Sequence, residues 1–450
     1  MITDTVKAED SYQAAFRSLQ ANASGAIPSW LERFRERAMD HFQASGFPGV
    51  TDEEWKYTNV TPIARGEFSP VVGGGSAVSL TEAELSAFSY PEATGSRLVF
   101  LNGLLVVENS SLTKASTGVV ALGLDEALQS ERFSEVVREF LGRVVEHHEN
   151  GFTALNTAFA GNGAFVFIPK GLVVESPLHL LFLSRQSEEH ANVAGFPRVL
   201  VLAEEHSNAT IIESYAGLDE SMHFTNALVE VVLKDGASLT HYRVQNENAK
   251  ALHVTTTGAE LGRHSRFDTT NITLGAKLSR HNLSVTMDHE GAECWVDGLY
   301  LVGGDQHTDT HSVIDHKQPH CTSHQLYKGI LDGKSRAVFN GKVFVRHGAL
   351  GTDANQTNKN LLLSNEAHVD TKPQLEILAD DVKCAHGAAI GQLDEDELFY
   401  LASRGIHQDL ARNLLTYGFA EEVIAKIKID SIKAQLDEAV LHRLNARLEA

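Results

Sequence analysis

The chain has 450 residues, of which 42% are hydrophobic and 22% charged, and this composition is typical of a globular protein with one elongated domain or several smaller ones. No apolar run approaches the roughly 20 residues that a membrane span needs, and a formal net charge of −21 offers no basic surface to nucleic acid. The N-terminus lacks the features of an export signal and the three cysteines are too scattered for a disulfide framework, so we expect a cytoplasmic chain with reduced thiols.

Residues 1–95 are predicted to form an N-terminal helical region followed by a linker. Apolar and small residues recur at three- and four-residue steps over residues 5–46, which is the period of an amphipathic helix. They are Tyr12, Ala15, Phe16 and Leu19, then Trp30, Leu31, Phe34 and Ala38. Pro28 marks the expected start of the second helix. The stretch that follows is rich in Gly, Ser and Pro, includes Gly73, Gly74 and Gly75, and is expected to be irregular.

From residue 96 to residue 392 the hydrophobic period changes to two, which predicts strands. Segments such as ASLTHYRVQ, HSRFDTTNITL and AVFNGKVFV alternate or run apolar, and a helical insert is expected near residues 125–150. A Gly, Asn or Glu followed by Ala recurs along this region, and neighbouring copies are often 16 to 22 residues apart. These pairs begin at Asn208, Gly236, Gly258, Gly275, Gly291, Gly348 and Glu366.

We interpret these pairs as the turns of a β-helix, or β-solenoid, in which each coil of the chain stacks on the one before. A single rung cannot bury its inner face, whereas stacked rungs form one continuous core. A β-sandwich or double barrel is the alternative, because its strands also recur at short intervals.

Residues 393–450 are predicted to form a C-terminal helical domain. Asp394 is a plausible N-cap, and Gly405 is a plausible glycine at the end of the first helix. The next helix, HQDLARNLLTYG, is expected to end on Gly418. An apolar stripe then continues at helical steps through Ile424, Ile427, Ile432, Leu436, Val440, Leu444 and Leu448. The stripe predicts packing against the body of the chain, and a partner-binding face is the alternative.

Several catalytic motifs are absent from the sequence or fail on spacing. The stretch YKGILDGKS has only three residues between its glycines Gly329 and Gly333, where a phosphate-binding P-loop needs four, and it lies in a strand context. The sequence contains no CxxC pair, HExxH, GxSxG or GxGxxG. We therefore expect no ATP hydrolysis by this chain itself.

The stretch GGDQHTDTHSVIDHKQPHCTSH is rich in potential metal ligands. His307, Asp309 and His311 lie at period two and hence on one strand face, and Cys321 follows closely. These residue types could bind iron or zinc, as in a metal-dependent oxygenase or isomerase. A polar ladder or hydrogen-bonded histidines at turns is the interpretation we favour. Asp309 and Asp315 also allow the two-carboxylate chemistry of a β-helical carbohydrate-active enzyme.

Cys384 and His386 are two residues apart on a predicted strand, so their side chains share one face. A thiolate and an imidazole on one face are a natural half-site for iron or an iron–sulfur cluster. Because such clusters take about four ligands, a second protein would have to complete the coordination. A buried structural cysteine is the common alternative for an isolated Cys-x-His pair.

Around this pair the sequence resembles a known family. The segment VKCAHGAAIGQLDEDELFYLASRGI is similar to a signature near the C-terminal end of SufD proteins, within the SufB/SufD family of iron–sulfur cluster assembly proteins. DQHTDTHSVIDHKQPHCTSHQLYKGIL and KPQLEILADDVK resemble the core shared by SufB and SufD, and EEWKYTNV is similar to an early SufD segment. The likeness extends over essentially the whole chain, and a SufB-like paralogue is the alternative within the family.

The resemblance implies a right-handed parallel β-helix flanked by helical N- and C-terminal domains, and a non-catalytic scaffold subunit of the SUF system. It implies pairing with a SufB-like paralogue through the β-helices, and docking of a SufC-like ATPase on the helices of residues 394–418. Cys384 and His386 match the pair that the family places at the interface of the paralogues, with His386 the better candidate for an iron or cluster ligand. No tightly bound cofactor is expected in the isolated chain, only a transient iron or cluster shared with the paralogue. A homodimer of the isolated chain is also compatible with an exposed solenoid edge.

Overall fold

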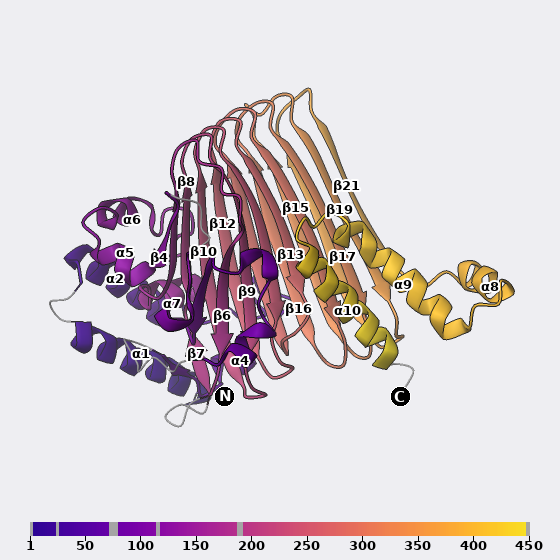
Figure 1. Cartoon of the computed structure of the whole chain (residues 1–450), viewed down its shortest axis with the longest axis horizontal. Coiled ribbons are helices and arrows are strands. Elements are labelled where there is room, and N and C mark those ends of the chain that lie inside the picture. The colour runs from indigo at the N-terminus through magenta and orange to yellow at the C-terminus, as the bar shows by residue number, and fades with distance from the viewer. Residues whose placement is uncertain (1–2, 24–26, 72–79, 114–117, 187–191, 447–450) are drawn as a thin grey trace.

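The computed structural model describes residues 3–23, 27–71, 80–113, 118–186 and 192–446. Figure 1 shows an elongated stack of strands with most N-terminal helices at one end and the C-terminal helices towards the other. Gly73, Gly74, Gly75 and Leu448, which the sequence assigned to the linker and the final stripe, lie outside the described residues, as does the side chain of Leu444. None of the helices in the described ranges is long and apolar enough to cross a membrane.

The N-terminal helices pack on the outside of the β-helix through the apolar stripe that the sequence predicted. Tyr12, Phe16, Leu31 and Ala38 are buried, and the second helix begins directly after Pro28. The helices of this part are α1 (Thr3–Ala23), α2 (Ser29–Ser45), η1 (Glu53–Trp55), α3 (Thr61–Ala64), α4 (Glu82–Ser86), η2 (Pro91–Ala93) and η3 (Val107–Asn109). The insert region contributes α5 (Leu124–Gln129) and α6 (Ser134–Phe140), and α7 (Gly151–Ala158) follows it.

The strands form a parallel β-helix, as the sequence predicted, in which two sheets alternate along the chain. One sheet, which we call sheet A, runs β20-β18-β16-β14-β12-β10-β8-β5-β4, with β7 and β1 at its side, and sheet B runs β21-β19-β17-β15-β13-β11-β9-β6-β2-β3. The bounds of the strands in sheet A are β1 (Ser69–Pro70), β4 (Val120–Gly123), β5 (Gly163–Ile168), β7 (Val193–Gly195), β8 (Arg198–Ala203), β10 (His223–Leu233), β12 (Leu252–Leu261), β14 (Leu278–Met287), β16 (His307–His316), β18 (Arg336–Val345) and β20 (His368–Ile377). Those in sheet B are β2 (Arg97–Leu101), β3 (Leu104–Leu105), β6 (Leu178–Ser184), β9 (Asn208–Gly217), β11 (Ser238–Asn246), β13 (Arg266–Thr273), β15 (Glu293–Val302), β17 (Thr322–Leu331), β19 (Asp353–Leu362) and β21 (Lys383–Gly391).

One coil of the β-helix is longer than the spacing of 16 to 22 residues that we read from the turn signals. From β8 onward paired residues are 26 to 32 apart, with Leu252 beside Leu278 at the short limit and Arg336 beside His368 at the long limit. The Gly-Ala, Asn-Ala and Glu-Ala pairs recur at shorter intervals than one coil because each coil contains two strands and therefore two turns.

The Gly258 pair is not a turn at all, because it lies within β12. A Cβ at Gly258 would be 2.6 Å from Cγ2 of Val145, so the glycine here allows the loop after α6 to approach the sheet closely.

Three apolar layers hold the fold together. The main core lies inside the β-helix between the two sheets, and includes Leu239, Phe267 and Val296. The N-terminal helices and the insert cover the outer face of sheet A. The C-terminal helices cover the outer face of sheet B, where Ile330 and Leu301 are buried against them. Alternate residues of each strand therefore face the interior and a covered outer face.

The C-terminal helices are α8 (Glu395–Ser403), α9 (Gln408–Ile424) and α10 (Asp430–Ala446). The side chain of Asp394 caps α8 by accepting from the backbone N–H groups of residues 396 and 397, and Gly405 follows its end with φ +85°, so both predicted boundaries are confirmed. The prediction that the next helix ends on Gly418 is wrong, since α9 continues to Ile424. Val423 and Ile424 bury against sheet B, and this packing outweighs the unfavourable helix propensity of one glycine.

Candidate functional site

Cys384 and His386 lie on β21, the last strand of sheet B. In the pairing of β19 with β21, Cys384 is beside Ala354 and His386 beside Gln356. Ala354 and Gln356 are both buried and point into the β-helix. The two candidate ligands therefore continue interior columns of side chains and stand where the interior opens at the end of the stack.

The two side chains differ in access to solvent. Cys384 is half-buried against the main core, and burial raises the pKa of its thiol. The imidazole of His386 is exposed. A soft thiolate and a borderline imidazole fit iron or an iron–sulfur cluster, although they supply only two of the usual four ligands. Within the described ranges no three His, Cys, Asp or Glu side chains are grouped to hold a metal ion.

The end of the β-helix that carries this pair is open. β20 and β21 are the terminal strands of their sheets, and large apolar side chains are exposed on and beside them. Ile377 is 41% exposed, Leu378 50% and Ile390 49%. A terminal strand presents unpaired backbone N–H and C=O groups and can accept a further strand. In Figure 1 this edge lies at the end of the stack near α8 and α9.

His307, Asp309 and His311 share the outer face of β16, as period two predicted, but residues from the N-terminal region cover them. Thr58 donates a hydrogen bond to the Asp309 carboxylate, and the Thr58 hydroxyl lies 2.9 Å from His307 Nε2. Because the single hydroxyl proton goes to Asp309, the second contact requires His307 Nε2–H to donate. The Arg280 guanidinium pairs with Asp309 at 2.7 Å and lies 3.6 Å from the Trp55 ring centroid.

His311 lies between two carboxylates. Its Nε2 is 3.1 Å from Asp309 Oδ1 and its Nδ1 is 3.2 Å from Glu54 Oε2. Burial lowers the pKa of His311, but the two carboxylates outweigh burial and raise it. An imidazolium that pairs on both nitrogens has no lone pair for a metal ion. This cluster therefore joins the N-terminal region to the β-helix, a contact that differs from the polar ladder or the histidines at turns that the sequence suggested.

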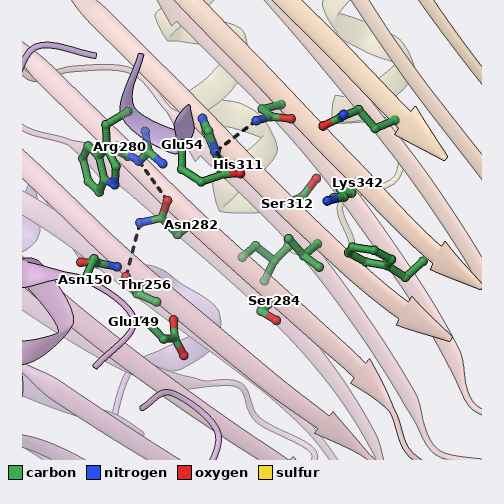
Figure 2. A pocket seen from close by; sticks show the side chains of 16 residues that line it. Glu54, Glu149, Asn150, Thr256, Arg280, Asn282, Ser284, His311, Ser312 and Lys342 are labelled. Atoms are coloured by element: carbon green, nitrogen blue, oxygen red, sulfur yellow. Dashed lines mark hydrogen bonds and ion pairs between the residues drawn. The ribbon is translucent and has the colours of Figure 1, made fainter. Parts of the chain in front are cut away.

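A pocket of about 360 Å³ lies beside this cluster on the outer face of sheet A. Figure 2 shows Arg280 hydrogen-bonded to Asn282, and Asn282 to Thr256, along one side of it. Glu54 and Glu149 line it from the N-terminal region and the insert. The two basic side chains on its wall are already paired, since Lys342 binds Glu376 and Arg280 binds Asp309.

The remaining residues of the histidine-rich stretch are dispersed. Cys321 is buried in the turn before β17, where its thiol contacts the backbone carbonyl of His289 at 3.3 Å, and it does not join His307 and His311. His316 points inside and hydrogen-bonds Ser323 at 2.8 Å, and burial lowers its pKa to about 4. His324 stacks on Trp295 outside sheet B.

The carboxylate pair proposed for carbohydrate chemistry also fails geometrically. Asp309 and Asp315 are six residues apart on one strand, which places them roughly 20 Å apart, and glycosidase carboxylates lie within about 10 Å. Asp315 is instead paired with Arg346 at 2.8 Å.

Sequence reasoning missed the partners of this cluster. The segment EEWKYTNV was noticed for its resemblance alone, yet its Glu54, Trp55 and Thr58 contact residues more than 200 positions further on. The hydrophobic period predicts which face of a strand a side chain occupies. It does not predict which distant segment of the chain covers that face.

Comparisons with known proteins give the following matches. Residues 184–419 match the family model described as SUF system FeS cluster assembly, SufBD core domain, and residues 6–180 match the model of the SufBD protein N-terminal region. The chain is 38% identical to an iron–sulfur cluster assembly SufBD family protein of Synechocystis, over 94% of this chain and 93% of that protein. It is 32% identical to the iron–sulfur cluster assembly protein SufD of Escherichia coli, over 95% of this chain and 98% of that protein. It is 26% identical to SufB of Bacillus subtilis, over 90% and 87% respectively.

Proposed function

The chain belongs to the SufBD family of iron–sulfur cluster assembly proteins, and we propose that it is a SufD-type scaffold subunit of the SUF system with no catalytic centre of its own. One observation supports this proposal above the others. Within the part of the chain that the structure describes, the outer edge of the terminal strand β21 pairs with no other strand, and β21 bears a cysteine and a histidine on one face at this end of the β-helix.

The partner at this end would be a SufB-like paralogue. Strand addition at β20 and β21 would satisfy the free backbone groups and cover the exposed apolar side chains Ile377, Leu378 and Ile390. In the absence of the paralogue the same edge would pair with a second copy of this chain.

Iron or a nascent cluster would be the cargo of that interface. His386, as the accessible imidazole, would be the main ligand and Cys384 would assist, while the paralogue would supply the remaining ligands. The cargo would be held transiently, because two ligands alone make a weak site.

The ATPase would dock on α8 and α9. Their outward side chains form an apolar patch, with Phe399 75% exposed, Tyr400 56%, Leu410 53% and Leu414 47%. Patches of this kind are typical of protein interfaces. Figure 1 shows α8 projecting away from the sheets, where a partner can reach it. Closure of the ATPase would then be transmitted through the rigid β-helix to the interface that holds Cys384 and His386.

Affinity capture of the chain from its own cytosol tests the proposal. We expect a SufB-like subunit and a SufC-like ATPase to be recovered with the wild type and with His386→Ala, while cluster assembly is lost in the variant. His289→Ala is the matched control, because His289 is an exposed histidine in a turn away from the open end. Recovery of the chain alone, with its own stoichiometric metal, would refute the scaffold function.

Two further measurements separate the parts of the proposal. Phe399→Asp is expected to lose the ATPase and keep the paralogue. A cross-link that locks the interface of the paralogues is expected to stop assembly, and unaffected assembly would exclude motion of that interface.

A further inference from the structure

The interior of the β-helix contains a group of polar side chains where an apolar core is expected. Glu213, Arg243 and Asn271 are in register on β9, β11 and β13 and point inward, so they lie next to one another across three consecutive coils. Tyr215 lies beside Arg243, with 5.6 Å between the guanidinium carbon and the ring centroid. We call Glu213, Arg243, Asn271, Tyr215 and Tyr327 the interior polar cluster.

Tyr327 reaches this cluster because of a glycine. It pairs with Gly298 on β15, and a Cβ at Gly298 would be only 2.0 Å from Cε1 of the Tyr327 ring. The ring therefore leans across β15 towards Asn271, which is in register with Gly298 on the other side. The chain thus directs a fifth polar side chain to the cluster from two coils away.

The cluster is buried, and many of its polar atoms make no hydrogen bond of normal geometry with any of the residues that the structure describes. Glu213 and Arg243 are 0% exposed, Tyr215 and Tyr327 1%, and Asn271 4%. The atoms without a hydrogen bond of normal geometry are both carboxylate oxygens of Glu213, Nε and Nη1 of Arg243, both polar side-chain atoms of Asn271, and the two tyrosine hydroxyls, although Glu213 interacts with His241 and Tyr215, and Tyr327 with Asn271. Glu213 Oε2 lies 3.4 Å from Nε2 of His241.

The other side of Arg243 has several short contacts in the same interior. Its Nη2 lies 2.7 Å from His253 Nε2 and 3.0 Å from Thr255 Oγ1, and Nδ1 of His253 lies 2.8 Å from Glu247. Glu247 in turn accepts from Gln245 and Thr225. Buried polar groups in folded proteins are almost always paired in this way, with protein or with ordered water. The unpaired side of Arg243 therefore requires a ligand.

We propose that the interior polar cluster encloses a group of ordered water molecules. The chemistry of the unpaired atoms selects this ligand. A metal ion would need several acceptors and no donors, yet the guanidinium and the amide nitrogen are donors. An anion would need donors alone, yet the Glu213 carboxylate would repel it. Water both donates and accepts, and one buried molecule typically serves about three polar groups.

The opposite sheet contributes short polar side chains to this interior, next to the larger His253 and His281. Its inward side chains at this level include Thr255 and Thr257 on β12 and Ser279 on β14, which are short and polar. Short polar side chains opposite long ones permit a polar space, whereas Leu or Phe at these positions would fill it.

Two substitutions at Asn271 give opposite results for a wet and a dry interior. If water occupies the cluster, Asn271→Ser admits a further molecule and unfolds at a higher temperature than Asn271→Leu, which leaves its neighbours without a partner. If the cluster is dry, Asn271→Leu removes two unpaired polar atoms and is the more stable of the two. The second order of melting temperatures would overturn the proposal.

Asn358→Leu is the control for this pair. The Asn358 amide donates to Tyr300 and to the backbone carbonyl of Tyr327, and its oxygen accepts from Asn360 and Thr371, so its pairing is entirely within the protein. Its loss lowers the melting temperature whether or not the interior polar cluster is wet.

A direct count of internal water in the wild-type chain tests the proposal independently of stability, and the two leucine variants then locate the water. Oxygen-17 magnetic relaxation dispersion counts water molecules that stay inside a protein, and we expect Asn271→Leu to reduce that count while Asn358→Leu leaves it unchanged. Wild-type protein without long-lived internal water, or with a stoichiometric metal ion or anion bound at Arg243, would overturn the proposal.

Discussion

Replacement of Glu230 by glutamine is expected to weaken the attachment of the insert to the β-helix severely. Glu230 on β10 and Arg198 on β8 form an ion pair with 2.7 Å between Nη2 and Oε2, and both side chains are 0% exposed. The same carboxylate accepts from the backbone N–H groups of Gly142, Val144 and Val145 in the loop after α6. The substitution keeps the shape of the side chain and removes its charge.

The magnitude follows from the burial of the pair. Removing one partner of a buried ion pair leaves the other charge uncompensated and costs about 3–5 kcal/mol. The glutamine nitrogen cannot accept a hydrogen bond, so at least one of the donors that converge on Glu230 also loses its acceptor. Against a total stability of about 5–15 kcal/mol for a folded domain, this is a large loss.

Urea titration followed by circular dichroism and by tryptophan fluorescence measures the loss, and the two probes must agree if a single free energy of unfolding is to be quoted. Glu260→Gln is the matched control, because Glu260 pairs at 2.6 Å with Arg143 of the same loop in an ion pair that is partly exposed. We expect this substitution to lower the free energy of unfolding by less than about 1 kcal/mol. Adding Arg198→Met to Glu230→Gln should recover part of the stability, since no buried charge is then left unpaired. Equal losses in Glu230→Gln and Glu260→Gln would refute the reasoning.

Three further predictions concern packing, pH and thiol access. Gly298→Ala places a Cβ 2.0 Å from the Tyr327 ring and is expected to lower the free energy of unfolding by about 1–3 kcal/mol. Gly418→Ala in α9 meets no atom within 4 Å and should raise the free energy of unfolding by about 0.4–1 kcal/mol. Urea midpoints that move in the same direction in the two variants would contradict this prediction. The pKa of His311 is raised, so the contribution of its ion pairs is complete below about pH 6.5 and is lost as the pH rises through the folded-state pKa. The difference in urea midpoint between wild type and His311→Gln should accordingly shrink above that pH, and a difference that grows would exclude the ion pairs. Cys384 should react first with a thiol reagent in the native protein, because the two other cysteines are buried, and mass spectrometry of the singly modified chain would reveal any other order.

Local features of the site could be predicted because they depend on near neighbours in sequence. The period of two placed Cys384 and His386 on one face of a strand, and it did the same for His307 and His311. The cap at Asp394 was predictable because its side chain bonds the backbone two and three residues later. Period, capping and turn chemistry act over a few residues, and the sequence displays them directly.

The role of individual glycines could not be predicted from local sequence. Gly418 and Gly258 were both interpreted as breaks, yet the first lies inside a helix and the second inside a strand. What decided each case was a contact with a distant part of the chain, namely sheet B for α9 and Val145 for β12. Propensity differences of about 1 kcal/mol give way to packing of that kind.

The sequence by itself determined the class of fold, the faces of its strands, and the Cys-x-His pair. Only the tertiary structure decided that this pair stands at an open end, that Thr58 and Glu54 cover the histidines of β16, and that Arg243 meets Asn271 inside the coil. In a parallel β-helix, neighbours across a rung are about 30 residues apart. Whether a side chain ends up paired, covered or exposed therefore depends on strand register and on docked segments, which no local pattern encodes.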